Sequence, residues 1–128
     1  MANPNIVNVT TIYGNTAVLA APYHASGGTA VAGANIVQNS TSSGYVYKIN
    51  FLSVTNNTAS TSTVTLDINR NATVSPIAYK ISVPSGSTLV LLAKDTGLYL
   101  LESDALQVTT SATNSIIAIT SYEQISTA

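Results

Sequence analysis

Residues 76–108 read PIAYKISVPSGSTLVLLAKDTGLYLLESDALQV and combine short apolar runs with tight turn signals. In the first run every second residue is apolar, which predicts a strand buried on one face. These residues are Ile77, Tyr79, Ile81 and Val83. The run LVLLA at 89–93 is apolar throughout and lies between the turn sequences PSGS and KDTG, so we expect a strand covered on both faces. Tyr79 and Tyr99 fall within these strands and are expected to be structural. The stretch predicts an antiparallel meander.

The segments before and after this meander continue the β pattern. In GYVYKINFLSVTN at 44–56 one face is expected to carry Tyr45, Tyr47, Ile49 and Phe51. Leu52 and Val54 then change the phase, which indicates a bulge or a crossing between sheets. STVTLDINR at 62–70 alternates strictly, and turn signals recur about every 8 to 12 residues without a helical period. We therefore predict an all-β fold, a single antiparallel β-sandwich (jelly-roll or Ig-like) of about 8 strands over residues 31–128.

Residues 1–30 are expected to form an extended N-terminal arm or edge strand. NIVNVTTIY at 5–13 is rich in β-branched residues and reads as a strand that ends at Gly14-Asn15. The small residues and Pro22 that follow are typical of a linker. Two interpretations stay open. The arm adds a strand to the sheet of a neighbouring molecule, or it supplies an edge strand to its own sandwich.

Composition separates this chain from most classes of soluble protein. Only 7% of its 128 residues are charged, against about a quarter in typical soluble domains, and 45% are hydrophobic, with a net charge of -1. A surface with so few charges favours association. The four basic residues are scattered, so no nucleic-acid footprint is expected. No membrane helix or signal peptide is expected, and the absence of cysteine excludes disulfides and thiolate metal sites.

Few residues are candidates for chemistry. His24 is the only histidine and lies in the arm, far in sequence from any acidic residue. Glu102 and Asp104, with Asp95 nearby, could form a carboxylate dyad or a calcium site, but Asp and Ser also favour tight turns for their backbone hydrogen bonds. We favour the turn, and we expect no catalytic residue, cofactor or metal.

Seven tyrosines offer a different kind of site. Tyr45 and Tyr47 share one strand face, which is either core or contact surface, because tyrosine combines an apolar body with a polar tip. As a contact surface, this pair could stack against a partner protein or a sugar. A carbohydrate-binding adhesion module is therefore an alternative function.

Several stretches together resemble a group of small virion structural proteins of tailed bacteriophages, especially phages of aquatic bacteria and cyanobacteria. They are NIVNVTTIYGNTAVLA, YKINFLSVTNNT, VTLDINR, AYKISVPSGSTLVLLAKDTGLYLLESDALQVTTSA and SYEQIS, which cover nearly the whole chain. The most specific part is the order of AYKISVP, KDT and SYE-IS along the chain. Where this family usually has glycine before Asp104, the chain has Ser103.

The resemblance implies a non-enzymatic particle component. The expected function is a capsid cement or decoration protein on the outer surface of the virion head. Its expected partners are copies of itself, as a homotrimer, and the major capsid protein. A tail, neck or baseplate component is the alternative within the family. The residues expected to make assembly contacts are Ile6, Val7, Ile12, Tyr13, Tyr23, Tyr45 and Tyr47.

Overall fold

The computed structural model describes residues 9–20, 23–24, 34–111 and 116–127, and most of these residues lie in strands. The strands are β1 (Val9–Ala20), β2 (Tyr23–His24), β3 (Ala34–Gln38), β4 (Tyr45–Asn56), β5 (Ser62–Arg70), β6 (Thr73–Val83), β7 (Thr88–Leu92), β8 (Leu98–Leu100), β9 (Ala105–Thr110) and β10 (Ile116–Thr127). A short 3-10 turn, η2 (Lys94–Thr96), separates β7 from β8. Within the described ranges, no helix has the length and apolar character needed to cross a membrane.

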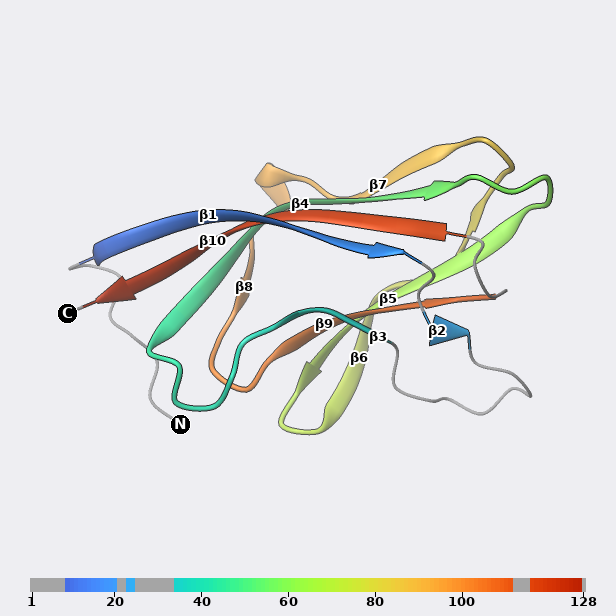
Figure 1. The fold of residues 1–128 in the computed structure, drawn as a ribbon. Coiled ribbons are helices and arrows are strands. Elements are labelled where there is room, and N and C mark those ends of the chain that lie inside the picture. The colour runs from blue at the N-terminus through green and yellow to red at the C-terminus, as the bar shows by residue number, and fades with distance from the viewer. Residues whose placement is uncertain (1–8, 21–22, 25–33, 112–115, 128) are drawn as a thin grey trace.

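The strands form two sheets that pack face to face (Figure 1). Sheet A has the order β1-β10-β4-β7, with β8 also paired to β4, and sheet B has the order β2-β9-β5-β6, with β3 also paired to β9. The antiparallel pairs are nested along the chain: β1 with β10, β3 with β9, β4 with β7 and β5 with β6. This nesting, a long hairpin rolled into two layers, defines a jelly roll. It confirms the predicted all-β sandwich and selects one of its two expected topologies.

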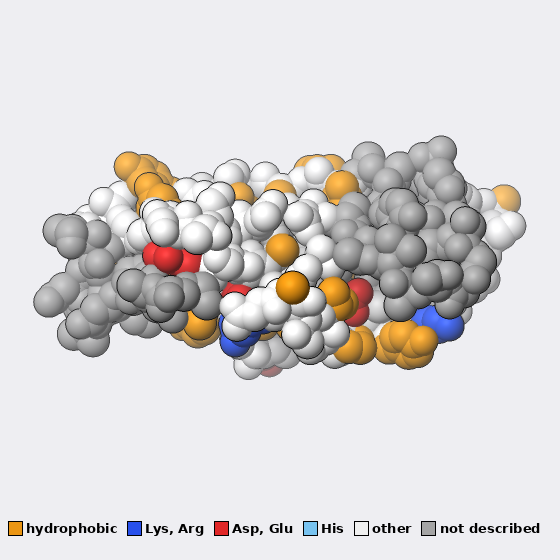
Figure 2. Space-filling model, turned by 90° about the horizontal axis from the view of Figure 1, so that it is seen from below, with side chains coloured by type: hydrophobic (Ala, Val, Ile, Leu, Met, Phe, Trp, Pro, Cys, Tyr) orange, Lys and Arg blue, Asp and Glu red, His pale blue; other side chains and the backbone are white. Residues whose placement is uncertain are grey.

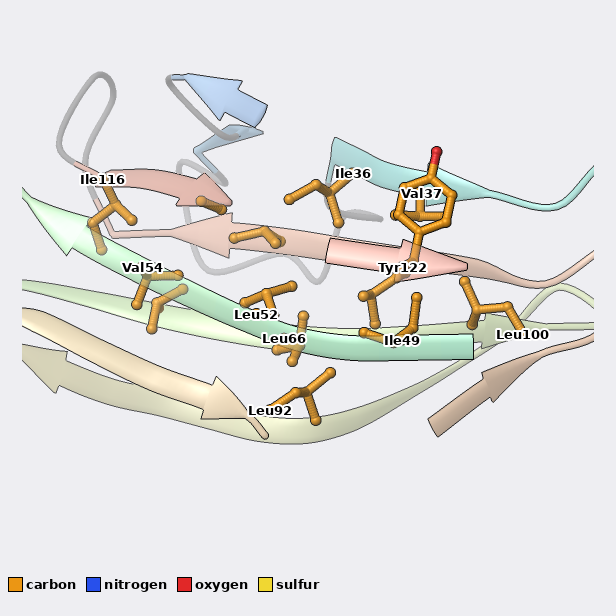
Figure 3. Close-up of a cluster of buried hydrophobic side chains, with 14 of the residues drawn as sticks. Ile36, Val37, Ile49, Leu52, Val54, Leu66, Leu92, Leu100, Ile116 and Tyr122 are labelled. Atoms are coloured by element: carbon orange, nitrogen blue, oxygen red, sulfur yellow. The ribbon is translucent and has the colours of Figure 1, made fainter. Parts of the chain in front are cut away.

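The core lies between the two sheets and is built from alternate residues of their strands (Figure 3). Leu52 and Val54 of β4 and Ile116 of β10 point inward from sheet A, and they meet Leu66 of β5 from sheet B. All four side chains are fully buried. Burial of each such side chain stabilises the fold by about 1.5–3 kcal/mol relative to leaving it exposed.

A bulge in β4 explains the predicted change of phase. Tyr122 of β10 pairs with Ile49 and Ser121 pairs with Phe51, so Asn50 is an extra residue on β4. The bulge keeps Ile49 and Leu52 both in the core. It also corrects one expectation, because Phe51 does not share a face with Ile49 and lies exposed on the outside of sheet A.

Two other burial predictions are wrong, both for edge strands. β6 is the edge of sheet B, and its register shifts twice against β5, so its apolar residues are largely exposed: Ile77, Tyr79 and Ile81, with only Val83 buried. β7 is the edge of sheet A, and Leu92 is buried while Val90 is exposed. Tyr99 is exposed as well. Apolar alternation predicts the strand, but a strand with one neighbour leaves much of its surface uncovered.

The described part of residues 1–30 is an edge strand of the same chain. β1 pairs antiparallel with β10 from Val9 to Ala20, as in the second of the two open interpretations. The strand does not end at Gly14-Asn15, because both residues continue the ladder opposite Glu123 and Tyr122. Residues 1–8 and 25–33 lie outside the described residues.

Candidate functional site

Among the described residues, the outer face of sheet A is a candidate contact surface. Cross-strand partners point to the same face of a sheet, so the registers define this surface row by row. One row crosses the whole sheet from Val18 on β1 through Ile119 and Ser53 to Val90 on β7. The next row toward the bulge runs from Thr16 through Ser121 to Phe51. Apolar side chains therefore lie at both edges and in the centre.

This face carries little charge. A third row holds Gly14, Glu123, Lys48 and Tyr99, so its two charged residues lie directly opposite each other on neighbouring strands. The other rows of the paired strands are uncharged. Val18, Val90, Phe51 and Tyr99 are all exposed. Exposed apolar patches of this kind mark contact sites more often than free surface.

The outer face of sheet B has a different character. Along β5 and β9, the outward residues are mostly polar: Thr63, Thr65, Asp67, Asn69, Gln107 and Thr109, with Ala105 opposite Asn69. The exposed apolar residues of sheet B lie on its edge strand β6: Val74, Ile77, Tyr79 and Ile81. Polar side chains hydrogen-bond here, as where the Gln107 side-chain amide donates to Asn35 Oδ1 at 2.8 Å. Figure 2 views the molecule from below, on the side of sheet B, and shows hydrophobic and uncharged polar side chains with few charged ones. The two outer faces thus differ most along their central strands, which are polar in sheet B and partly apolar in sheet A.

Two of the four tyrosines expected to make contacts, Tyr45 and Tyr47, lie in or against the core. Tyr47 is buried, stacks on Tyr122 with ring centroids 5.4 Å apart, and accepts a hydrogen bond from the Gln124 side chain. Burial raises the pKa of the Tyr47 hydroxyl, and the neighbouring Tyr122 raises it further. Tyr45 is half-buried against the core, 6.3 Å from Tyr47. Tyr47 therefore supports the core and offers no stacking platform for a sugar.

The remaining predicted contact residues divide into three groups. Ile12 and Tyr13 are exposed on β1, near the end of the strand. Ile6 and Val7 lie outside the described residues. Tyr23 lies in β2, and the structure describes its backbone only.

The carboxylates that could have formed a dyad are held by structural hydrogen bonds. Glu102 accepts the backbone N–H groups of Ser42 at 3.1 Å and Gly44 at 3.2 Å, one on each oxygen. Asp104 accepts the backbone N–H of Leu101 and the guanidinium of Arg70. These contacts favour the turn over the dyad, because no oxygen of either group lacks a structural donor.

A metal site is not formed by the described residues either. Across residues 9–20, 23–24, 34–111 and 116–127, no group of three or more His, Cys, Asp or Glu side chains could hold a metal ion. The described surface thus offers an apolar sheet face rather than a cluster of reactive groups.

Sequence reasoning missed most of this face, although local signals were present in β7 and β10. In β10 both Ile116 and Ile117 are apolar, and Ile119 follows two positions later. Ile116 faces the core while Ile117 and Ile119 point outward and are half-buried. A central strand that is apolar on both faces predicts cover on both sides. Val90 lies in the run LVLLA, which likewise predicted cover on both faces, whereas Val18 and Phe51 carry no comparable local signal.

Comparison of the chain with protein-family models and with curated protein sequences finds no match.

Proposed function

We propose that this protein is a non-enzymatic structural protein of a phage virion, a capsid cement protein that binds the major capsid protein on the outside of the head. The contact is made by the outer face of sheet A. The observation that carries the proposal is the nearly uncharged outer face of sheet A, on which exposed apolar residues reach from edge to edge, whereas the central strands β5 and β9 of sheet B are polar outside. The family resemblance of the sequence supplies the identity of the partner.

The jelly roll itself carries less weight. This architecture occurs in viral capsid proteins, lectins and cupins, so it hosts binding and catalysis alike. The distribution of side chains separates these classes better. The carboxylates have structural partners and Tyr47 is buried, which leaves the apolar face as the best-supported site.

A broad uncharged face suits a cement protein on physical grounds. Burial of apolar surface gives roughly 25 cal/mol per Å², and a standard interface buries about 800 Å² on each partner. Lost translational freedom and side-chain ordering offset much of this gain. Many copies bound around a closed shell would then supply retention without strong single contacts.

The direct test is sedimentation of the purified protein with emptied, undecorated heads and, separately, with tails. We expect binding to heads that saturates, and none to tails. Binding to tails alone would overturn the capsid proposal and favour a tail, neck or baseplate component.

Two matched variants test the face. Phe51→Lys places a charge at the centre of the outer face of sheet A and should weaken head binding by about tenfold or more, because a buried unpaired charge is costly. Val74→Lys places the same charge at an exposed position on β6 of sheet B and should bind like the unmodified protein. Equal binding by both variants would contradict the assignment of the face.

A further inference from the structure

We propose that two copies of the protein pair through the open edge of β1. The two β1 strands run antiparallel, so that sheet A continues from one molecule into the other. The occupant of the edge is a second copy of the same chain. This contact uses the edge of sheet A, whereas head binding uses its outer face, and Val18 belongs to both.

The open edge of β1 presents backbone groups that pair with no other strand among the described residues. The backbone N–H of Thr16 donates to Asn15 Oδ1 of its own strand at 2.8 Å, so it points away from β10. In an antiparallel ladder, outward and inward backbone groups alternate along the strand. Ile12, Gly14, Thr16 and Val18 therefore turn their N–H and C=O groups to the open edge. Apart from the ladder with β10, the described backbone hydrogen bonds include none from β1.

The other long edge is protected against pairing, and β1 is not. β6 contains Pro76, which has no N–H, and Lys80 with a φ of 49°, and its register shifts twice. Proline, lysine and bulges are the usual devices that prevent edge-to-edge association. Between Val9 and Ala20, β1 has no proline and no charged residue, and it follows β10 without a register shift from Thr11 to Ala20. β7 has only five residues.

The side chains of β1 are complementary to a second β1. A two-fold axis at Asn15 places Ile12 of each copy opposite Val18 of the other and Gly14 opposite Thr16. Ile12 and Val18 are the exposed apolar residues on the outward face of this strand. They would pack against each other twice, once on each side of the axis. Gly14 has no side chain that could hinder the approach of the second strand, and no heavy atom lies within 4 Å of the position where its Cβ would stand.

Lack of charge makes this self-pairing possible. A two-fold contact brings the same surface of both copies together, so any charged cluster on the edge would face a cluster of the same charge and repel it. The edge has none. A homotrimer, which the family resemblance implies, needs a heterologous contact instead. The β1 edge thus predicts a dimer, and in that dimer the two outer faces of sheet A lie side by side as one larger surface.

The first test measures the oligomeric state and its response to a charge on the edge. Sedimentation equilibrium should give a dimer. Val18→Lys should raise its dissociation constant by about tenfold or more, because the lysine replaces an apolar contact. Val90→Lys is the matched control, since Val18 and Val90 are 62% and 58% exposed in the same row at opposite edges of sheet A. It should leave the dimer unchanged while weakening head binding.

The second test fixes the register. The chain has no cysteine, so single-cysteine variants report one contact at a time. Asn15→Cys should form a disulfide with its own copy under mild oxidation, whereas Ile12→Cys should not. Asn15→Cys also removes the hydrogen bond that Asn15 donates to the Tyr122 hydroxyl, so a second measurement leaves Asn15 in place. A mixture of Gly14→Cys and Thr16→Cys proteins should yield the mixed disulfide.

Three results would overturn the proposal. They are a monomer at all concentrations, a trimer, or a dimer that Val18→Lys and Val90→Lys weaken equally. A self-disulfide at position 12 with none at position 15 would refute the register and with it the predicted two-fold contact. Loss of head binding in the unmodified protein bears only on the cement function, because the dimer is measured without heads.

Discussion

Arg70 holds the carboxylate of Asp104 with two nitrogens, Nε at 3.0 Å from both oxygens and Nη2 at 2.6 Å from Oδ2. Arg70 ends β5, and Asp104 lies in the turn between β8 and β9. The Asp104 side chain is fully buried, whereas that of Arg70 is 46% exposed. The hydrogen bond to Asp104 raises the pKa of the Arg70 guanidinium. This ion pair ties the hairpin of sheet B to the corner that also contains Glu102.

Removal of one partner should therefore destabilise the protein. Arg70→Met leaves the buried Asp104 carboxylate without its counter-ion, and we expect a loss of about 1.5–3 kcal/mol in the free energy of unfolding, typical of hydrogen bonds to charged groups. Urea denaturation measures this loss. In a double-mutant cycle, adding Asp104→Asn should cost less in the Arg70→Met background than alone. Additive losses would show that the two residues act independently.

A second prediction concerns Asp67 on β5. Burial raises the pKa of the Asp67 carboxyl, and its cross-strand partner Gln107 has a buried Oε1 without a hydrogen-bond partner among the described residues. A raised pKa means that the folded state holds this proton more tightly than the unfolded state. The contribution of Asp67 to stability is therefore greatest below its ordinary pKa and is lost as the pH rises through the folded pKa.

Asp67→Asn should consequently stabilise the protein at pH 7, because the amide is uncharged and can donate to Gln107. The gain should shrink as the pH falls through the raised pKa of the folded state and should be smallest below the ordinary pKa of aspartate. Thermal unfolding from pH 3 to pH 7 measures the difference between the two proteins. A variant that is less stable than the parent at pH 7 would mean that the charged carboxylate is satisfied in the fold.

The turn between β5 and β6 gives a third prediction. Asn71 and Ala72 connect the paired residues Arg70 and Thr73, and both have positive φ, at 53° and 61°. Such two-residue turns favour Asn-Gly, because glycine adopts this conformation without a steric penalty. Ala72→Gly should raise the free energy of unfolding by about 1 kcal/mol. Ala59→Gly, in an exposed loop without positive φ, is the control and should give no gain.

The same reasoning applies to Ser103, where the resembling family usually has glycine. Ser103 has a φ of 71°, a conformation that favours glycine. Its hydroxyl is 2.8 Å from that of Thr41, an exposed contact of modest value. Ser103→Gly should therefore keep or slightly raise the melting temperature. A clear decrease would show that the Thr41 contact outweighs the backbone strain.

Local patterns were sufficient to predict the fold class, the alternation in β5 and the change of phase in β4, but not the outward position of Phe51. Val64 and Leu66 alternate with polar residues because β5 has a neighbour on each side and one covered face. The phase change before Leu52 indicated a bulge, and the extra residue is Asn50. These signals are local, since each depends on residues within one strand.

Strand order was beyond the reach of the same patterns. Ile77 and Tyr79 alternate as core residues do, yet they lie on an edge, because pairing partners are set by contacts distant in sequence. Tyr45 and Tyr47 could not be assigned to core or surface from sequence for the same reason. The proposed contact face is assembled from four strands, so Val18 and Val90 come to lie on one surface only after the chain has folded.

The most direct test of the proposed function is hydroxyl-radical footprinting of the protein, free and bound to undecorated heads. Phe51 and Tyr99 are exposed aromatic residues on the outer face of sheet A, and Tyr79 is an exposed aromatic residue on the edge of sheet B. Binding through the outer face predicts that Phe51 and Tyr99 become protected while Tyr79 is oxidised as in the free protein. Protection of Tyr79 with unchanged oxidation of Phe51 and Tyr99 would contradict the account.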